Sequence, residues 1–169
     1  YVDGKYYIYV TLRLNADGKR DNNVMRRQLV MVSDRPEGPY SKPVCLEVDD
    51  IDPSLFVDDD GTPWMSWGNG TCFLVKLKPN MTELDGNIEI LKMPKFVEGP
   101  WIHKRENLYY LTYASMGKGR ETISYATAPS MEGPWTYRGV LTGMAENSFT
   151  IHPGIIEFKG QNYLFYHNA

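Results

Sequence analysis

Two acidic residues occupy matching places in this sequence, each at the start of an apolar, aromatic-containing segment. Asp52 precedes Pro53 and the segment 54–57, and Glu98 precedes the segment 101–103. Two carboxyl groups that face one pocket can divide the acid and base roles of a hydrolysis between them, provided that their environments separate their pKa values. For Asp52 the alternative is a simple turn former before proline.

The tripeptide Glu-Gly-Pro occurs three times, so it does not by itself single out Glu98. Glu37 and Glu132 follow the third apolar segment of their repeats, where we expect an outer bend. Glu98 instead opens a segment, as Asp52 does. His152, before Pro153 and Gly154, has the equivalent place in the last repeat. The sequence therefore predicts an axial Asp, Glu and His cluster, and the alternative for His152 is a structural histidine.

The elements that must position these residues are strands. Helical periodicity is nearly absent, and Asp-Gly or Lys-Gly turn signals recur at residues 3–4, 17–18, 60–61, 85–86 and 159–160. We expect residues 58–60 to be solvated turn residues.

A repeat appears when the hairpins are aligned. Four aromatic strands start about 45 to 58 residues apart, a period that suits one four-stranded propeller blade. We predict an all-β chain that forms about three and a half blades of one partial propeller domain. The predicted blades are residues 1–48, 49–94, 95–143 and, for half of the fourth blade, 144–169.

Composition narrows the function classes. The formal net charge is -3, which does not indicate a nucleic-acid or membrane-surface partner, and no apolar run of 18 residues is present. Twelve Tyr and four Trp suit sheet packing and also sugar binding. Trp67 and Trp101 are the predicted sugar-binding tryptophans. The two cysteines define no disulfide framework, and Cys72 is expected to be a buried free thiol.

These residues resemble glycoside hydrolase family 43. The resemblance rests on Ile51-Asp52-Pro53-Ser54 with its Asp-Asp-Gly turn, on Glu98-Gly99-Pro100 before Leu108-Tyr109-Tyr110-Leu111, and on His152-Pro153-Gly154. It implies a five-bladed β-propeller and an inverting hydrolase of xylans, arabinans or arabinoxylans. It also implies that Glu98 is the general acid, with a raised pKa, and that Asp52 tunes this pKa and orients the substrate. His152 would line the pocket, or hold a central calcium or sodium through water. No cofactor is required.

The same resemblance places the base aspartate about ten residues before Tyr6, ahead of Tyr1. Asp3 lies in an expected turn and does not match that position. We therefore expect a fragment of a secreted or periplasmic protein that is a poor catalyst by itself, because loss of a general base costs roughly 10²–10⁴-fold. Self-association or complementation by the remaining blades would cover the open blade faces.

Other interpretations stay open. A non-catalytic carbohydrate-binding or scaffold propeller would share the fold, as would a fructan-cleaving hydrolase with a carboxylate nucleophile. Residues 145–150 lean toward a xylosidase or an arabinofuranosidase without separating the two. The polar segment 15–27 is either a substrate-contacting loop over the pocket or a disordered one.

Overall fold

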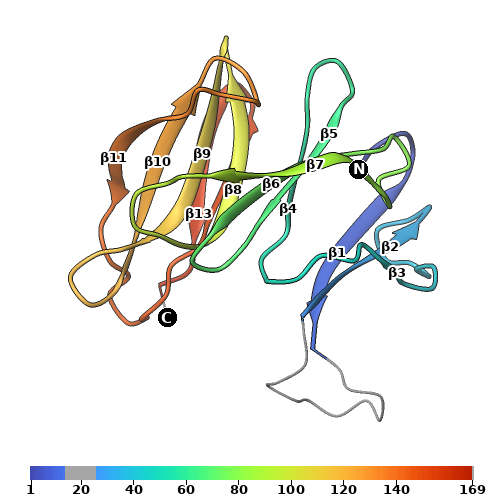
Figure 1. Ribbon diagram of the computed structural model, residues 1–169, viewed down its shortest axis with the longest axis horizontal. Helices are drawn as coiled ribbons and strands as arrows, with labels where there is room; N and C mark the ends of the chain where they lie inside the picture. Colours follow the sequence, from blue (N-terminus) through green and yellow to red (C-terminus); the bar gives the residue numbers. More distant parts are fainter. Residues whose placement is uncertain (14–25, 169) are drawn as a thin grey trace.

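The computed structural model describes residues 1–13 and 26–168, and this part of the chain contains thirteen strands and no helix (Figure 1). The strands are β1 (Tyr6–Leu12), β2 (Arg27–Ser33), β3 (Val44–Cys45), β4 (Ser54–Val57), β5 (Pro63–Trp67), β6 (Cys72–Leu77), β7 (Leu84–Leu91), β8 (Phe96–Arg105), β9 (Leu108–Met116), β10 (Glu121–Ala128), β11 (Thr136–Thr142), β12 (Pro153–Phe158) and β13 (Gln161–Tyr166). None of the described segments is a helix long and apolar enough to cross a membrane.

The strands form four separate antiparallel sheets in chain order, which we number blades 1 to 4. Their strand orders are β1-β2-β3, β4-β5-β6-β7, β8-β9-β10-β11 and β12-β13. Every neighbour in a sheet is also a neighbour in sequence, so each blade is a simple meander. Figure 1 shows the blades following one another across the molecule, with the red β13 behind β9. The four sheets lie within the four predicted residue ranges.

Local turn chemistry explains most of the hairpins. Between β12 and β13, Lys159 and Gly160 both have positive φ, of 52° and 75°, as a two-residue hairpin turn requires. The turn predicted at Asp85 and Gly86 is wrong, because both residues lie within β7. There, a register shift opposite residues 74–76 absorbs the extra residues as a bulge, and Gly86 adopts a φ of 103°.

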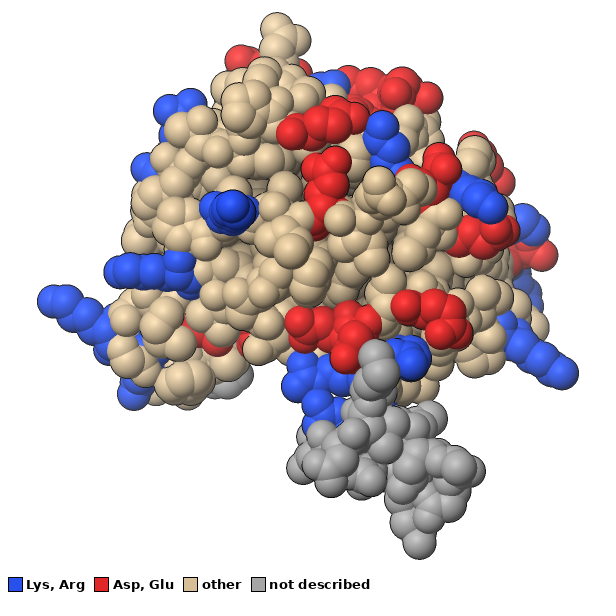
Figure 2. Space-filling view, viewed as in Figure 1, with Lys and Arg blue, Asp and Glu red and all other residues tan. Residues whose placement is uncertain are grey.

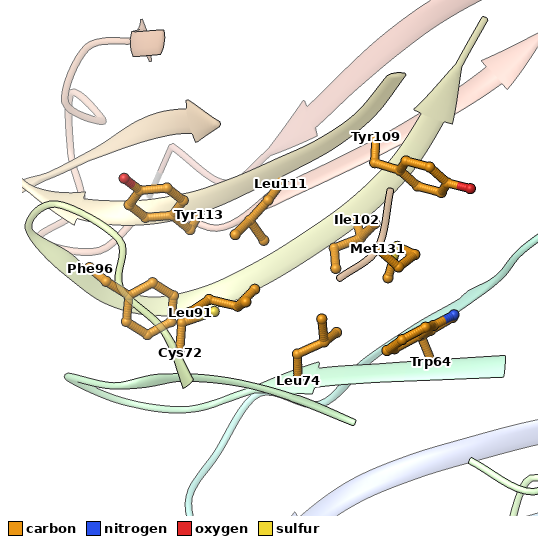
Figure 3. Close-up of a cluster of buried hydrophobic side chains, with 10 residues drawn as sticks. All are labelled: Trp64, Cys72, Leu74, Leu91, Phe96, Ile102, Tyr109, Leu111, Tyr113 and Met131. Atoms are coloured by element: carbon orange, nitrogen blue, oxygen red, sulfur yellow. The ribbon is translucent and has the colours of Figure 1, made fainter. Parts of the chain in front are cut away.

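The cores lie between blades. The largest cluster joins blades 2 and 3, and Figure 3 shows side chains of Trp64, Cys72 and Leu74 facing those of Ile102 and Leu111. A second cluster around Val30, Met65 and Trp67 joins blades 1 and 2. Ile123, Ala145 and Ile151 form a smaller cluster beside blade 4. Each sheet therefore buries its face against the next blade, which is why successive blades hold fixed relative positions.

The surface agrees with the composition. On the face drawn in Figure 2, basic and acidic side chains are interspersed, without a continuous basic patch. Blade 4 leaves several large apolar side chains exposed: Ile156, Phe158, Tyr163, Phe165 and Tyr166. Both cysteines are free, and Cys72 is buried as expected.

Candidate active site

Asp52, Glu98 and His152 come from three successive blades and meet at one place. Nε2 of His152 lies 2.9 Å from Oε1 of Glu98 and 3.9 Å from Oδ2 of Asp52. One ligand atom of each residue lies within 4.8 Å of those of the others. Asp52 precedes β4, Glu98 is the third residue of β8, and His152 directly precedes β12. Equivalent places at the starts of innermost strands therefore converge.

The backbone around Glu98 is shaped for this approach. Register shifts between β8 and β9 fall on both sides of Glu98, between residues 96 and 98 and between 98 and 101. Such bulges re-aim a side chain out of the regular alternation. Gly99 has a φ of 60°, and a Cβ there would lie only 3.0 Å from Cγ of His152. The Gly-Pro that follows Glu98 thus leaves room for the imidazole. The other two copies differ in place, since Glu37 and Glu132 lie at bends outside the strands.

The electrostatics reverse one expectation. The hydrogen bond from His152, more than any other cause, lowers the pKa of Glu98, although burial opposes this. The same bond raises the pKa of His152. Burial, together with the nearby charge of Glu98, raises the pKa of Asp52. The expected raised pKa of Glu98 is therefore wrong for the protein without substrate, because the hydrogen bond from His152 at 2.9 Å outweighs desolvation.

Asn69 is a site residue that the sequence reasoning missed. It lies in the turn between β5 and β6, and its Nδ2 donates to Oε2 of Glu98 at 2.6 Å. Its backbone N–H donates to Oδ2 of Asp50 at 2.9 Å. The available signal was the sequence Gly68-Asn69-Gly70, a tight turn directly after an aromatic strand.

Glu121 is a second residue that was missed. It opens β10 with only 2% of its surface exposed, and its Oε2 accepts the backbone N–H of Ile151 at 3.0 Å. Burial raises its pKa. This bond holds the chain immediately before His152. No periodicity in the sequence distinguishes such a buried acid from an exposed strand residue.

The two predicted tryptophans lie differently. The sugar-binding role predicted for Trp67 is wrong because the residue is buried. It is 2% exposed, packs on Phe73 and donates Nε1–H to the carbonyl of Asp49. A ring without a free face cannot stack on a sugar. Trp101 is half-buried and donates Nε1–H to the carbonyl of Ile155, which ties blade 3 to blade 4. Its role toward a sugar stays a prediction.

Three other features considered in the sequence lie apart from the axial cluster. The segment 15–27 falls almost entirely outside the described residues; of its last residues, Arg26 pairs with Asp50, Nη1 to Oδ1 at 3.1 Å. Asp3 has a φ of 47° in the turn where Val2 pairs with Lys5. Asp58 is not a simple solvated turn residue, because Tyr109 donates to its carboxylate.

The oxygen-rich cluster of Asp52, Glu98 and His152 would suit a hard cation. Oδ2 of Asp52 is buried and makes no hydrogen bond with the described residues. Calcium takes six to eight oxygen ligands. The carboxylate of Asp52 could therefore supply part of a shell, while the nitrogen of His152 would act through water; both oxygens of Glu98 already have partners, Asn69 and His152.

Comparisons with known proteins agree on one family. The family model "Glycosyl hydrolases family 43" matches residues 1–168. A beta-D-galactofuranosidase of Aspergillus niger is 33% identical over 148 residues, which are 79% of this chain and 44% of that protein. A xylosidase/arabinosidase of Bacteroides ovatus is 28% identical over 211 aligned residues, covering 99% of this chain and 62% of that protein. The chain thus spans about half to three-fifths of the length of these relatives.

The solved structures extend this likeness to the fold. A family 43 beta-xylosidase/alpha-arabinofuranosidase from a compost metagenome, in complex with xylotriose and in a calcium-free form, superposes with a TM-score of 0.84 at 28% identity. The match covers 98% of this chain and 62% of that one. The predicted all-β fold, part of a five-bladed propeller, is confirmed.

Proposed function

Because the chain belongs to glycosyl hydrolase family 43, we propose that it is the acid-bearing part of an inverting glycosidase acting on xylose- or arabinose-containing saccharides. The observation that carries this proposal is the convergence of Asp52, Glu98 and His152, with Nε2 of His152 2.9 Å from Oε1 of Glu98. Glu98 is the proton donor to the leaving group. Asp52 tunes the acid and orients the sugar. His152 supplies the proton to Glu98.

The proton transfer follows from the coupled charges. In the protein without substrate the bond raises the pKa of His152 and lowers that of Glu98, which favours an imidazolium beside a carboxylate. A sugar that covers the pair excludes water, and a drier site favours the neutral forms of both groups. The proton then moves from Nε2 to Oε1, and from Glu98 to the glycosidic oxygen as the bond to the anomeric carbon breaks. The negative charge of Asp52 favours the protonated form of Glu98 in that state.

The second half of the reaction needs a water activated by a base. In an inverting enzyme the acid and base carboxyl groups stand about 6.5–9.5 Å apart, which leaves room for this water. The resemblance puts the base ahead of Tyr1. Residues 1–169 alone are therefore expected to hydrolyse substrate about 10²–10⁴-fold more slowly than a protein that contains this base.

Three sugars are candidates because of the relatives. Their names specify xylose, arabinose and galactofuranose. The panel for the test is accordingly 4-nitrophenyl β-xyloside, α-arabinofuranoside and β-galactofuranoside. Residues 1–169 are compared with the longest natural form of the protein, and proton NMR of the released sugar reports whether its anomeric configuration is inverted.

The decisive variant is Glu98→Gln, which keeps the shape of the side chain and removes its acid. We expect a loss of at least about 10²-fold in kcat/KM. The matched control is Glu132→Gln. Glu132 begins another copy of the Glu-Gly-Pro sequence, but it lies at an outer bend and pairs with Lys76 at 3.1 Å. Full activity in Glu98→Gln would refute the proposal. Sugar binding without hydrolysis in every form would support a carbohydrate-binding propeller instead.

Two finer proposals concern partners of this part of the chain. Exposed apolar side chains on blade 4 favour self-association or complementation by further blades, and sedimentation at several concentrations tests this. A calcium ion at the propeller axis would use Oδ2 of Asp52 and contact His152 through water. Calcium should then raise the melting temperature of the wild type and not that of Asp52→Asn.

A further inference from the structure

The turn between β5 and β6, residues 68–71, contacts both backbones that carry the axial carboxylates. The N–H of Gly68 donates to the carbonyl of Ile51 at 2.8 Å, next to Asp52. The N–H of Gly70 donates to the carbonyl of Val97 at 2.7 Å, next to Glu98. One short turn therefore links the starts of β4 and β8.

Asn69, at the tip of this turn, completes the link with its side chain. Its Nδ2 lies 2.6 Å from Oε2 of Glu98, while Oε1 of the same carboxylate is bonded to His152. An amide oxygen in place of Nδ2 would face a carboxylate oxygen, so the donor must be the nitrogen. Each oxygen of Glu98 thus has its own partner, and the carboxyl plane is held from both sides.

Blade 1 anchors the turn from the other direction. Asp50 accepts the N–H of Asn69 at Oδ2 and pairs with Arg26 through Oδ1. The carbonyl of Asp50 accepts a hydrogen bond from Nε2 of Gln28, a residue of β2 that is fully buried. A buried side-chain amide with both ends bonded is a rigid support, and Oε1 of Gln28 also accepts from Thr11.

The turn tolerates only glycine at its first position. Gly68 has a φ of 129°, and a Cβ there would lie 1.9 Å from the carbonyl oxygen of Thr71. That contact is with backbone, so it cannot be relieved by moving a side chain. The conformation that aims Asn69 at Glu98 is therefore built into the sequence Gly68-Asn69-Gly70.

We propose that Asn69 is a positioning residue for the acid Glu98: by donating to Oε2 it leaves Oε1 as the oxygen that carries the transferable proton. An oxygen that already accepts the short N–H bond is poorly placed to hold a proton on that side. When Glu98 is protonated, the proton consequently lies on the oxygen that faces His152. The kinetic part of this inference rests on the proposed function, whereas the hydrogen bond itself does not.

The first test is independent of hydrolysis. In NMR spectra of the isotope-labelled chain, the Asn69 side-chain amide proton bonded to a carboxylate should resonate downfield. Glu98→Gln should move it upfield, because a charge-assisted bond becomes a neutral one. Glu132→Gln is the control and should leave it in place. If the chemical shift of the Asn69 side-chain amide proton does not change in Glu98→Gln, the inference is overturned, whether or not the protein is a glycosidase.

The second test uses kinetics in the longest natural form of the protein. Asn69→Leu removes the donor, and we expect kcat to fall about 10–100-fold with KM within about twofold, as for a misplaced acid. Asn69→Asp keeps the shape of the side chain, and its kcat should fall by a similar factor. This variant replaces Asn69→Leu in the test if the leucine variant does not fold. Asn80→Leu is the matched control, because Asn80 donates to Glu83 at the same 2.6 Å on an outer turn. Unchanged kcat, or a change confined to KM, overturns the inference.

Discussion

Nε2 of His152 lies 2.9 Å from Oε1 of Glu98, although the two residues are 54 positions apart in the sequence. The bond joins the first strand of blade 3 to the start of blade 4. Each partner shifts the pKa of the other, upward for His152 and downward for Glu98. The pair therefore couples stability to pH.

The stabilisation from this pair should be largest between about pH 4.5 and 6.5, the ordinary pKa values of the two groups. The raised pKa of His152 contributes stability that is full below 6.5 and is lost as pH rises through the raised value. The lowered pKa of Glu98 contributes stability that is full above 4.5 and is lost as pH falls through the lowered value.

His152→Asn measures this window. Because the His152 side chain is one-third exposed, solvent screening limits the difference to about 1 kcal/mol, or roughly 2–4 °C in melting temperature. Melting curves of both proteins from pH 3 to 9 should converge at either extreme. A difference that stays constant with pH would mean that His152 stabilises through packing alone.

Glu121 should stabilise the chain before His152 as an acceptor and not as a charge. Glu121→Ala leaves the buried N–H of Ile151 without a partner, at a cost of about 1–3 kcal/mol in the free energy of unfolding. Glu121→Gln retains an acceptor and, because burial already raises the pKa of Glu121, should cost less than about 1 kcal/mol. Urea unfolding measures both, with exposed Glu157→Ala as the control. Equal losses in Gln and Ala would refute the acceptor role.

Asp58 and Asp59 are neighbours with different expected effects. The Asp58 side chain is 14% exposed and accepts from Tyr109 at 2.7 Å, linking blade 2 to blade 3. The Asp59 side chain is 82% exposed and pairs with Lys104 at 2.7 Å. Asp58→Ala should cost about 1–3 kcal/mol and Asp59→Ala less than about 1 kcal/mol. Thermal or urea unfolding distinguishes them, and a larger loss from Asp59→Ala would contradict the burial argument.

Trp67 should affect stability and leave substrate binding unchanged. Trp67→Phe removes the donor to the carbonyl of Asp49 and part of a buried ring, so we expect a loss of about 1–3 kcal/mol. KM for the best aryl glycoside should stay within about twofold. A rise in KM without a loss of stability would restore the sugar-stacking role.

Features that depend on local pattern could be predicted from the sequence. Alternating aromatic strands and positive-φ turns such as Lys159-Gly160 depend on near neighbours, so the blades and most hairpins were predictable. The convergence of Asp52, Glu98 and His152 followed from the repeat, because equivalent positions in successive blades face the same axis. The turn predicted at Asp85-Gly86 was wrong because the pairing of β6 with β7 places a bulge there.

Only the tertiary structure decided how these residues interact. The direction of each pKa shift depends on burial and on the charged or hydrogen-bonding groups nearby, and the repeat places backbones without placing side-chain atoms. The burial of Trp67, the acceptor role of Glu121 and the bond from Asn69 to Glu98 arise between segments that are remote in sequence. Composition and spacing determined which residues reach the axis, while packing between blades determined the direction in which the pKa of each is shifted.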